Sequence, residues 1–241
     1  MPSTTANGIT IEYEDHGDPS APPILLVMGL GSQLTAWPTE MVDALVARGF
    51  RVIRYDNRDV GLSTRFDAAA VPNLKWLLVR SRLGLPLRVP YRLADMAKDA
   101  VGLLDALGIS KAHIVGASMG GAISQHVAAT HGHRALSLIS LMSTTGNRRL
   151  PRAKPEVRMM LVSRPQTADP EERIAYSVKT LRVIGGPVYP EAEERLQARV
   201  RASQARSWYP QGFARQMAAI IADGDEHIQL TGCEIHGGPR W

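Results

Sequence analysis

The sequence predicts an α/β fold, in which a mostly parallel, doubly wound sheet carries an inserted helical cap. Patterns typical of strands and of helices alternate from residue 9 to residue 143, as expected when each parallel strand is followed by a helix. From Asn147 to about Ala222 helical periodicity dominates and no convincing strand interrupts it. We therefore predict a core over residues 1–146, a helical cap over 147–222 and a remnant of the core over 223–241.

The predicted strands differ in how they are buried. Residues 9–17 alternate apolar and polar side chains, which is typical of an antiparallel strand with one solvated face. Residues 22–29 are continuously apolar, as expected for a strand covered on both faces. Further strands are predicted at 51–56, 111–117 and 135–143. A poor strand is predicted at 227–238, because Thr231-Gly232 interrupts its pattern.

Three helices are predicted between these strands. Residues 39–50 place Met41, Leu45 and Phe50 near one side of a helix that stops at Gly49. Residues 93–109 carry an apolar stripe that ends at Gly108. Residues 119–132 form the third helix, and the segment 57–92, rich in Arg and Pro, is predicted to be a loop.

Composition excludes several classes of protein. The 241 residues are 44% hydrophobic and 21% charged, which is typical of a globular domain. The longest apolar runs are too short to span a bilayer and the first residues lack a signal-peptide pattern, so we expect a cytoplasmic protein with no membrane partner. The single cysteine, Cys233, has no neighbouring metal-ligand pattern. We therefore expect no metal and no cofactor.

The net charge of +5 is concentrated in one segment. Residues 147–222 contain fourteen Lys and Arg against seven Asp and Glu, an excess of +7 that leaves −2 for the rest. Basic and acidic residues alternate there at helical spacing, which is typical of solvated helix faces and does not match a nucleic-acid-binding motif. We expect no nucleic-acid partner, and binding of an acidic partner is the alternative for this segment.

One serine stands out chemically. Gly116-Ala117-Ser118-Met119-Gly120 fits the Gly-x-Ser-x-Gly pattern, with an apolar strand before it and a helix after it. Such a strand-to-helix turn needs small flanking residues, because neighbouring segments pass close to the serine. We predict that Ser118 is a nucleophile; the alternative is a serine that only caps the helix.

A nucleophilic serine needs donors for the negative charge that develops on the carbonyl oxygen of its substrate. The residue after the nucleophile, Met119, provides one backbone N–H. The glycine-rich stretch Met28-Gly29-Leu30-Gly31 follows an earlier strand and provides the second through Leu30. The alternative for this stretch is a simple glycine turn between strand and helix.

The segments LLVMGLGSQLTAW, VIRYDNRDVGLST and DAVGLLDALGISKAHIVGASMGGAISQ together resemble the α/β-hydrolase superfamily, specifically serine esterases similar to aclacinomycin methylesterase. The resemblance covers residues 9 to about 222. It implies hydrolysis of a small-molecule carboxylic ester through an acyl-serine, beneath a helical cap. It also implies that Asp56, Arg58, Gly61 and Ser63 support the loop at the rim of the site, without acting as catalysts.

The general base is the open question at this stage. The resemblance implies a later acid and then a histidine, but in this chain CEIHGG is followed only by Pro239, Arg240 and Trp241, so we expect the family's C-terminal region to be shortened. His236 is the candidate base and His227 the alternative. The candidate orienting carboxylates are Asp223, Asp225 and Glu226.

Two functional hypotheses follow from this pattern. The first is a carboxylesterase, and the second is a catalytically impaired α/β-hydrolase fragment or a non-catalytic protein that binds a small molecule. Loss of the base alone costs roughly a million-fold in turnover. We also expect a homo-oligomer, because the last predicted strand leaves an open sheet edge, and a partner chain is a further source of a base.

Overall fold

The computed structural model describes residues 2–146, 154, 157, 160, 167, 169–185 and 190–223. The chain forms two compact units. One comprises Met1–Asn147 with Gln211–Trp241, and the other comprises Arg148–Pro210. No described helix has the length and apolarity that crossing a membrane requires.

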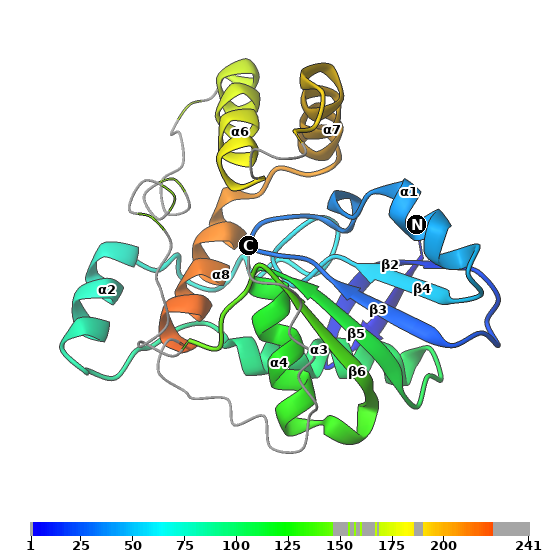
Figure 1. Ribbon diagram of the computed structural model, residues 1–241. Helices are drawn as coiled ribbons and strands as arrows, with labels where there is room; N and C mark the ends of the chain where they lie inside the picture. The colour runs from blue at the N-terminus through cyan, green and yellow to red at the C-terminus, as the bar shows by residue number, and fades with distance from the viewer. Residues whose placement is uncertain are drawn as a thin grey trace. The chain divides into compact units, whose positions relative to one another are not determined.

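A mixed sheet forms the centre of the first unit, and its described strands run in the order β1-β2-β4-β3-β5-β6 (Figure 1). The pairs β1–β2 and β2–β4 are antiparallel, whereas β4, β3, β5 and β6 are mutually parallel. The strands are Ser3–Ala6 (β1), Ile9–His16 (β2), Pro23–Val27 (β3), Arg51–Tyr55 (β4), Ala112–Ala117 (β5) and Ala135–Leu141 (β6). The predicted mostly parallel α/β sheet is confirmed.

Helices cover both faces of this sheet, which explains the continuous apolar run of β3. Leu25 and Val27 belong to the cluster that includes α3 (Leu93–Ala106) and α4 (Met119–Thr130). Ile24 and Leu26 belong to the cluster on the opposite face, which includes Val42 of α1 (Thr39–Val46). Successive side chains of a strand point to opposite faces, so both sets are buried.

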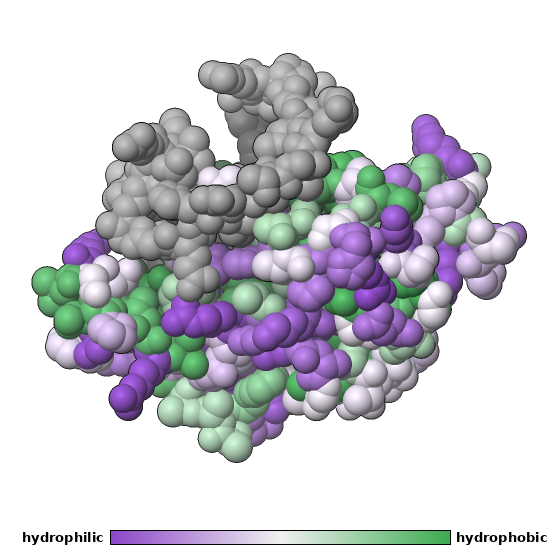
Figure 2. Space-filling model, turned by 90° about the horizontal axis from the view of Figure 1, so that it is seen from below, coloured by the Kyte–Doolittle hydropathy of each residue, from purple (hydrophilic) through white to green (hydrophobic). Residues whose placement is uncertain are grey.

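Figure 2 shows apolar and hydrophilic residues interspersed over one outer face of the molecule.

One β-strand and one α-helix of the described structure, β1 and α2, lie outside the sequence predictions. β1 is four residues long, too short for a period-2 pattern to stand out. Helix α2 (Leu74–Arg82) occupies part of the predicted loop 57–92, and Asn73 caps it by accepting a hydrogen bond from the Trp76 amide at 3.1 Å. Trp76 is 58% exposed and Leu77 is buried, so the apolar residues of α2 do not all face inward.

The second unit contains α6 (Pro170–Ile184) and α7 (Glu193–Arg206). Asp169 caps α6 by accepting from the Glu171 amide at 2.9 Å, and Pro170 occupies the first helical turn, where no N–H is needed. The two helices pack through a small apolar cluster of Ile174, Val178, Leu196 and Val200.

Helix α8 (Pro210–Asp223) belongs almost entirely to the first unit. The sequence places the end of the cap at residue 222, so the structure assigns this helix differently. Ala219 lies in the main core cluster, and Arg215 and Gln216 are fully buried through polar contacts. Helical periodicity does not distinguish such buried polar residues from solvent-facing ones.

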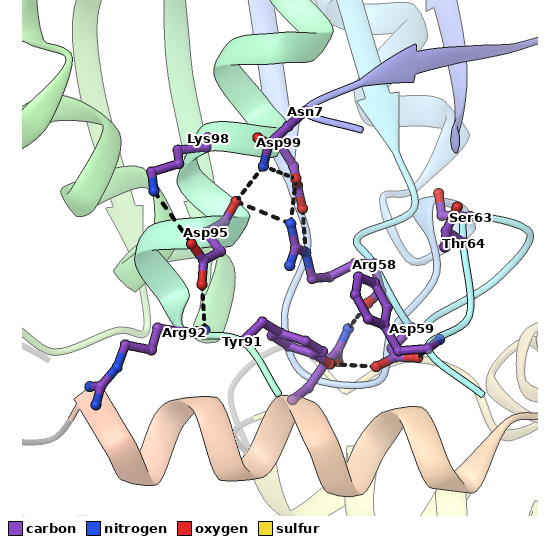
Figure 3. A network of polar contacts seen from close by, with 12 residues as sticks. Asn7, Arg58, Asp59, Ser63, Thr64, Tyr91, Arg92, Asp95, Lys98 and Asp99 are labelled. Carbon is purple, nitrogen blue, oxygen red and sulfur yellow. Dashed lines mark hydrogen bonds and ion pairs between the residues drawn. The ribbon is translucent and has the colours of Figure 1, made fainter. Parts of the chain in front are cut away.

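A buried polar network ties α8 to the loop after β4 (Figure 3). Arg215 donates from Nε and Nη2 to the two carboxylate oxygens of Asp59, at 2.8 and 2.9 Å. The Tyr91 hydroxyl donates to Asp59 Oδ2 at 2.8 Å, and burial raises the pKa of Tyr91 far above its usual range, so the hydroxyl stays protonated. The neighbouring Arg58 binds Asp99 through two hydrogen bonds of 2.6 Å.

Helix α4 approaches β3 without an intervening side chain. A Cβ atom on Gly120 would lie 2.0 Å from the carbonyl oxygen of Val27. This distance is far below a van der Waals contact, and the Val27 carbonyl belongs to the backbone, so it cannot rotate away from the added atom. The contact fixes α4, and with it the turn that precedes the helix, against the end of β3.

Replacing Arg215 with Met should lower the free energy of unfolding by about 3–5 kcal/mol, because the buried Asp59 carboxylate then loses its counter-ion. Urea unfolding checks this value. The control is Lys98→Met, which removes an exposed partner of Asp95 at 3.5 Å. Its cost should stay below about 1 kcal/mol. Equal midpoint shifts for the two variants would contradict the prediction.

Gly120→Ala should destabilise the protein by about 3 kcal/mol or more, because the added methyl group forces α4 away from β3. Gly132→Ala is the matched control, since a Cβ there meets nothing within 4 Å. Thermal unfolding of both variants measures the difference. If both unfold at the same temperature, the close approach of Gly120 to Val27 does not exist in solution.

Candidate active site

Ser118 occupies the single residue between β5 and α4, in a backbone conformation that side-chain-bearing residues rarely adopt. Its φ is 55° and its ψ is −120°. Its amide donates to the Leu141 carbonyl at 2.9 Å, and its carbonyl accepts from the Gly121 amide at 2.9 Å. Ala117 and Met119 on either side are buried, whereas Ser118 is exposed. The turn thus presents a hydroxyl on otherwise buried backbone.

The glycine-rich loop after β3 passes directly beside this serine. A Cβ built on Gly29 would lie 3.1 Å from Ser118 Cβ and 3.6 Å from Ser118 Oγ. The structure therefore brings together Ser118, Met119 and the segment that contains Leu30, as the sequence motifs predict. Met119 is the first residue of α4, where a backbone N–H has no acceptor inside the helix.

The loop that follows β4 is held by its own polar side chains. Asp56 accepts from the Leu34 amide at 2.7 Å and from the Leu62 amide at 3.0 Å. Ser63 donates to the Asp56 carbonyl at 2.6 Å, and a Cβ on Gly61 would collide with the Asp56 carboxylate. With the Arg58–Asp99 pair, these contacts give all four residues the predicted structural role.

Two buried amide side chains near the site have no counterpart in the sequence predictions. Asn57 Nδ2 donates to the Met28 carbonyl at 2.9 Å, and Gln216 Oε1 accepts from the Gly31 amide at 2.8 Å. Both partners belong to the glycine-rich loop. No sequence signal identifies these residues, because asparagine is common in loops and glutamine is common on solvated helix faces.

Among the described histidines, His126, His113 and His16 have side-chain partners other than Ser118. His126 Nε2 lies 2.8 Å from Asp223 Oδ1 in a largely buried pair that joins α4 to the end of α8. His113 bonds Ser137, and His16 bonds Glu14. Asp223 is thus the partner of His126, although the sequence offers it as a carboxylate for the catalytic base.

Several predicted positions lie outside the described residues. They are His227, His236, Asp225, Glu226 and Cys233, together with the strand predicted over 227–238. Within the described ranges no group of three or more His, Cys, Asp or Glu side chains is arranged to hold a metal ion.

Comparison with known proteins gives consistent matches to one family. The α/β-hydrolase fold family matches residues 22–180. Rhodomycin D methylesterase DauP of Streptomyces sp. (strain C5) is 36% identical over 138 residues, which are 57% of this chain and 40% of the relative. DnrP of Streptomyces peucetius, of the same name, matches with the same identity and coverage. The chain thus spans about two fifths of the length of these curated relatives.

Solved structures agree on the fold. A hydrolase from Pseudomonas aeruginosa PA01 has a TM-score of 0.59 at 25% identity, over 91% of this chain and 72% of that one. The meta-cleavage product hydrolase of Pseudomonas fluorescens IP01 has a TM-score of 0.68 over 97% of this chain and 77% of that one. At 20% identity the second likeness shows the fold alone.

The matched residues 22–180 are more than half of the 241-residue chain, and they include the sheet from β3 to β6 and the turn at Ser118. The chain therefore belongs to the α/β-hydrolase fold family.

Proposed function

We propose that this protein is a carboxylic ester hydrolase that acts through an acyl-serine intermediate at Ser118. One observation carries the proposal: the exposed hydroxyl of Ser118 stands on a strained turn, beside a loop whose Gly29 Cβ position is 3.6 Å from Ser118 Oγ. The names of the relatives, rhodomycin D methylesterases, support a carboxylic ester of a small molecule as the substrate class.

The proposed oxyanion hole consists of the backbone N–H groups of Leu30 and Met119. Within the described part of the chain, no residue accepts a hydrogen bond from either amide. Preorganised donors of this kind stabilise the negative charge that forms on the carbonyl oxygen when the serine attacks. Loss of one donor typically costs about 100- to 1,000-fold in turnover.

The proposed reaction has two steps. Ser118 Oγ attacks the ester carbonyl carbon, its proton passes to the general base, and the alcohol leaves with that proton. Water then attacks the acyl-serine, gives its proton to the same base and releases the carboxylic acid as Ser118 is protonated again. We propose His236 as the base and His227 as the alternative, with Asp225 or Glu226 as the orienting carboxylate because Asp223 already pairs with His126.

A second candidate function is a catalytically impaired hydrolase, or a protein that binds a small molecule without turnover. The observation that favours it is that no histidine in the described ranges forms a hydrogen bond with Ser118. A serine without a base retains only the contribution of the oxyanion hole and of substrate binding, about 10³- to 10⁴-fold over water.

The cytoplasmic location and the homo-oligomer stay predictions. For the oligomer, the supporting observation is β6, the last strand in the order of the described sheet. Leu136, Ile139 and Leu141 on this strand are 50%, 48% and 39% exposed. Ile139 and Leu141, two residues apart, lie on the same face of β6, and Leu136 lies on the other face. Exposed apolar side chains of this kind are typical of a surface that associates with another chain.

Ser118→Ala should lower the hydrolysis of p-nitrophenyl butyrate by at least about 1,000-fold, because the proposed acyl intermediate forms on the Ser118 hydroxyl. Absorbance of released p-nitrophenol measures the rate. The matched control is Ser137→Ala on β6, which removes the partner of His113 and should leave the rate within about 2-fold. Equal rates for wild type and Ser118→Ala would exclude this enzymatic function.

His236→Ala should lower kcat by about 10⁴-fold or more and leave KM nearly unchanged, because the base acts in the transition state and does not bind the substrate. His227→Ala should retain wild-type turnover. The opposite pattern would assign the base to His227. Wild-type kcat in both variants would show that the base is neither residue.

A further inference from the structure

The glycine-rich loop is held at both ends by buried side-chain amides. Asn57 Nδ2 donates to the Met28 carbonyl at 2.9 Å, and the Gly31 amide donates to Gln216 Oε1 at 2.8 Å. Between these two contacts lie Gly29, which adjoins Ser118, and Leu30, which supplies the proposed oxyanion donor. The direction of the Leu30 N–H therefore depends on two hydrogen bonds made by residues far along the chain.

The side chain of Gln216 has one orientation available to it. Its Nε2 donates to the Arg58 carbonyl at 2.7 Å, and its Oε1 accepts from the Gly31 amide. If the side-chain amide were rotated by half a turn, Oε1 would face the Arg58 carbonyl oxygen and Nε2 would face the Gly31 N–H, and neither hydrogen bond could form. Gln216 is 0% exposed, so no solvent can replace either contact. A buried amide with both ends satisfied is a rigid connection between its two partners.

Gln216 itself is fixed by the residue before it. Arg215 forms the buried, two-pronged ion pair with Asp59, the residue after Arg58. Two consecutive residues of α8 thus bind two consecutive residues of the loop after β4. The same loop supplies Asn57, so the three polar side chains position the segment 28–31 as one unit.

We propose that Gln216 is a positioning residue for the oxyanion loop, residues 28–31, and that it aligns the Leu30 N–H with Ser118. This inference rests on the proposed function. Gln216 does not touch the substrate; it acts through the Gly31 amide. An oxyanion donor must lie within hydrogen-bond distance of the developing charge, and a displacement of about 1 Å costs on the order of 100-fold in rate.

The first experiment compares Gln216→Met with Gln125→Met. Methionine keeps the length and helix propensity of glutamine but can neither donate to Arg58 nor accept strongly from Gly31. Gln125 is the matched control, because it is also buried in a helix of the same unit and donates at 3.0 Å to Ser140, away from the oxyanion loop.

Gln216→Met should lower kcat for p-nitrophenyl butyrate by about 10- to 100-fold with KM within about 3-fold, and Gln125→Met should keep kcat within about 3-fold. Amide hydrogen exchange, followed by NMR, should accelerate at Gly31 by about 10-fold or more in Gln216→Met and stay within about 2-fold in the control. Unchanged exchange at Gly31 overturns the inference. Faster exchange with wild-type kcat also overturns it, since the loop is then not positioned for catalysis by Gln216.

A second variant, Gln216→Glu, separates positioning from a general structural role. The protonated carboxyl group reproduces both contacts, since its carbonyl oxygen accepts from Gly31 and its hydroxyl donates to the Arg58 carbonyl. After deprotonation a carboxylate oxygen faces that carbonyl without a proton between them. The ratio of variant kcat to wild-type kcat should therefore fall as the pH rises, and a ratio independent of pH contradicts the positioning role.

These measurements distinguish a failure of the proposed esterase function from a failure of the positioning role of Gln216. If wild type hydrolyses the ester no faster than Ser118→Ala, the chain is not the proposed esterase, and the exchange rates alone decide whether Gln216 holds the loop. If hydrolysis depends on Ser118 and both Gln216 variants behave like wild type, the esterase proposal stands and the positioning role is wrong.

Discussion

The close packing of the turn at Ser118 against the end of β3 is the constraint on which the site depends. The backbone of Ser118 is strained by about 1–3 kcal/mol, and such strain persists only where the surroundings allow no other path. Here Ala117 is fixed in β5 and Met119 in α4, and the Val27 carbonyl occupies the space that a side chain at Gly120 would need. Relaxing the turn would separate α4 from the sheet and expose its buried apolar residues. The exposed serine is therefore a consequence of how the core packs.

The second requirement is that irregular backbone beside the serine finds hydrogen-bond partners. Loops at the end of a sheet carry N–H and carbonyl groups that no neighbouring strand satisfies, and leaving such groups buried and unpaired costs about 1–3 kcal/mol each. In this protein carboxylates and amides fill that need. Asp56 accepts from Leu34 and Leu62, Asp59 accepts from the Phe66 amide, and Asn57 donates to Met28. The acidic groups are then balanced by buried cations such as Arg215, which explains why charges lie inside this part of the core.

Much of this architecture follows from sequence patterns that report local burial. The five longer strands, the helices before and after β5 and the turn at Ser118 were all predictable, because each has a periodicity or a required small residue. β1 and α2 were not, since one is too short and the other exposes apolar side chains such as Trp76. The assignment of α8 was also beyond the sequence. In the helical periodicity of the sequence, the buried pair Arg215-Gln216 looks the same as two polar residues on a solvated helix face. Only the contact of Arg215 with Asp59, 156 residues earlier, shows that the pair is buried.

The contacts of α8 show that the five-residue nucleophile motif specifies the position of Ser118 but not the position of the other residues of the site. The motif determines where the Ser118 hydroxyl lies, because the strain is local to the turn. The proposed oxyanion donor at Leu30 belongs to a different segment, whose amide at Gly31 is held by a residue 185 positions later. Hydrogen bonds of this kind connect the oxyanion loop, residues 28–31, to the loop after β4 and to the last described helix within the first unit. A substitution on the buried face of α8 is thus a change to the site itself, although no atom of α8 belongs to the motif that identifies it.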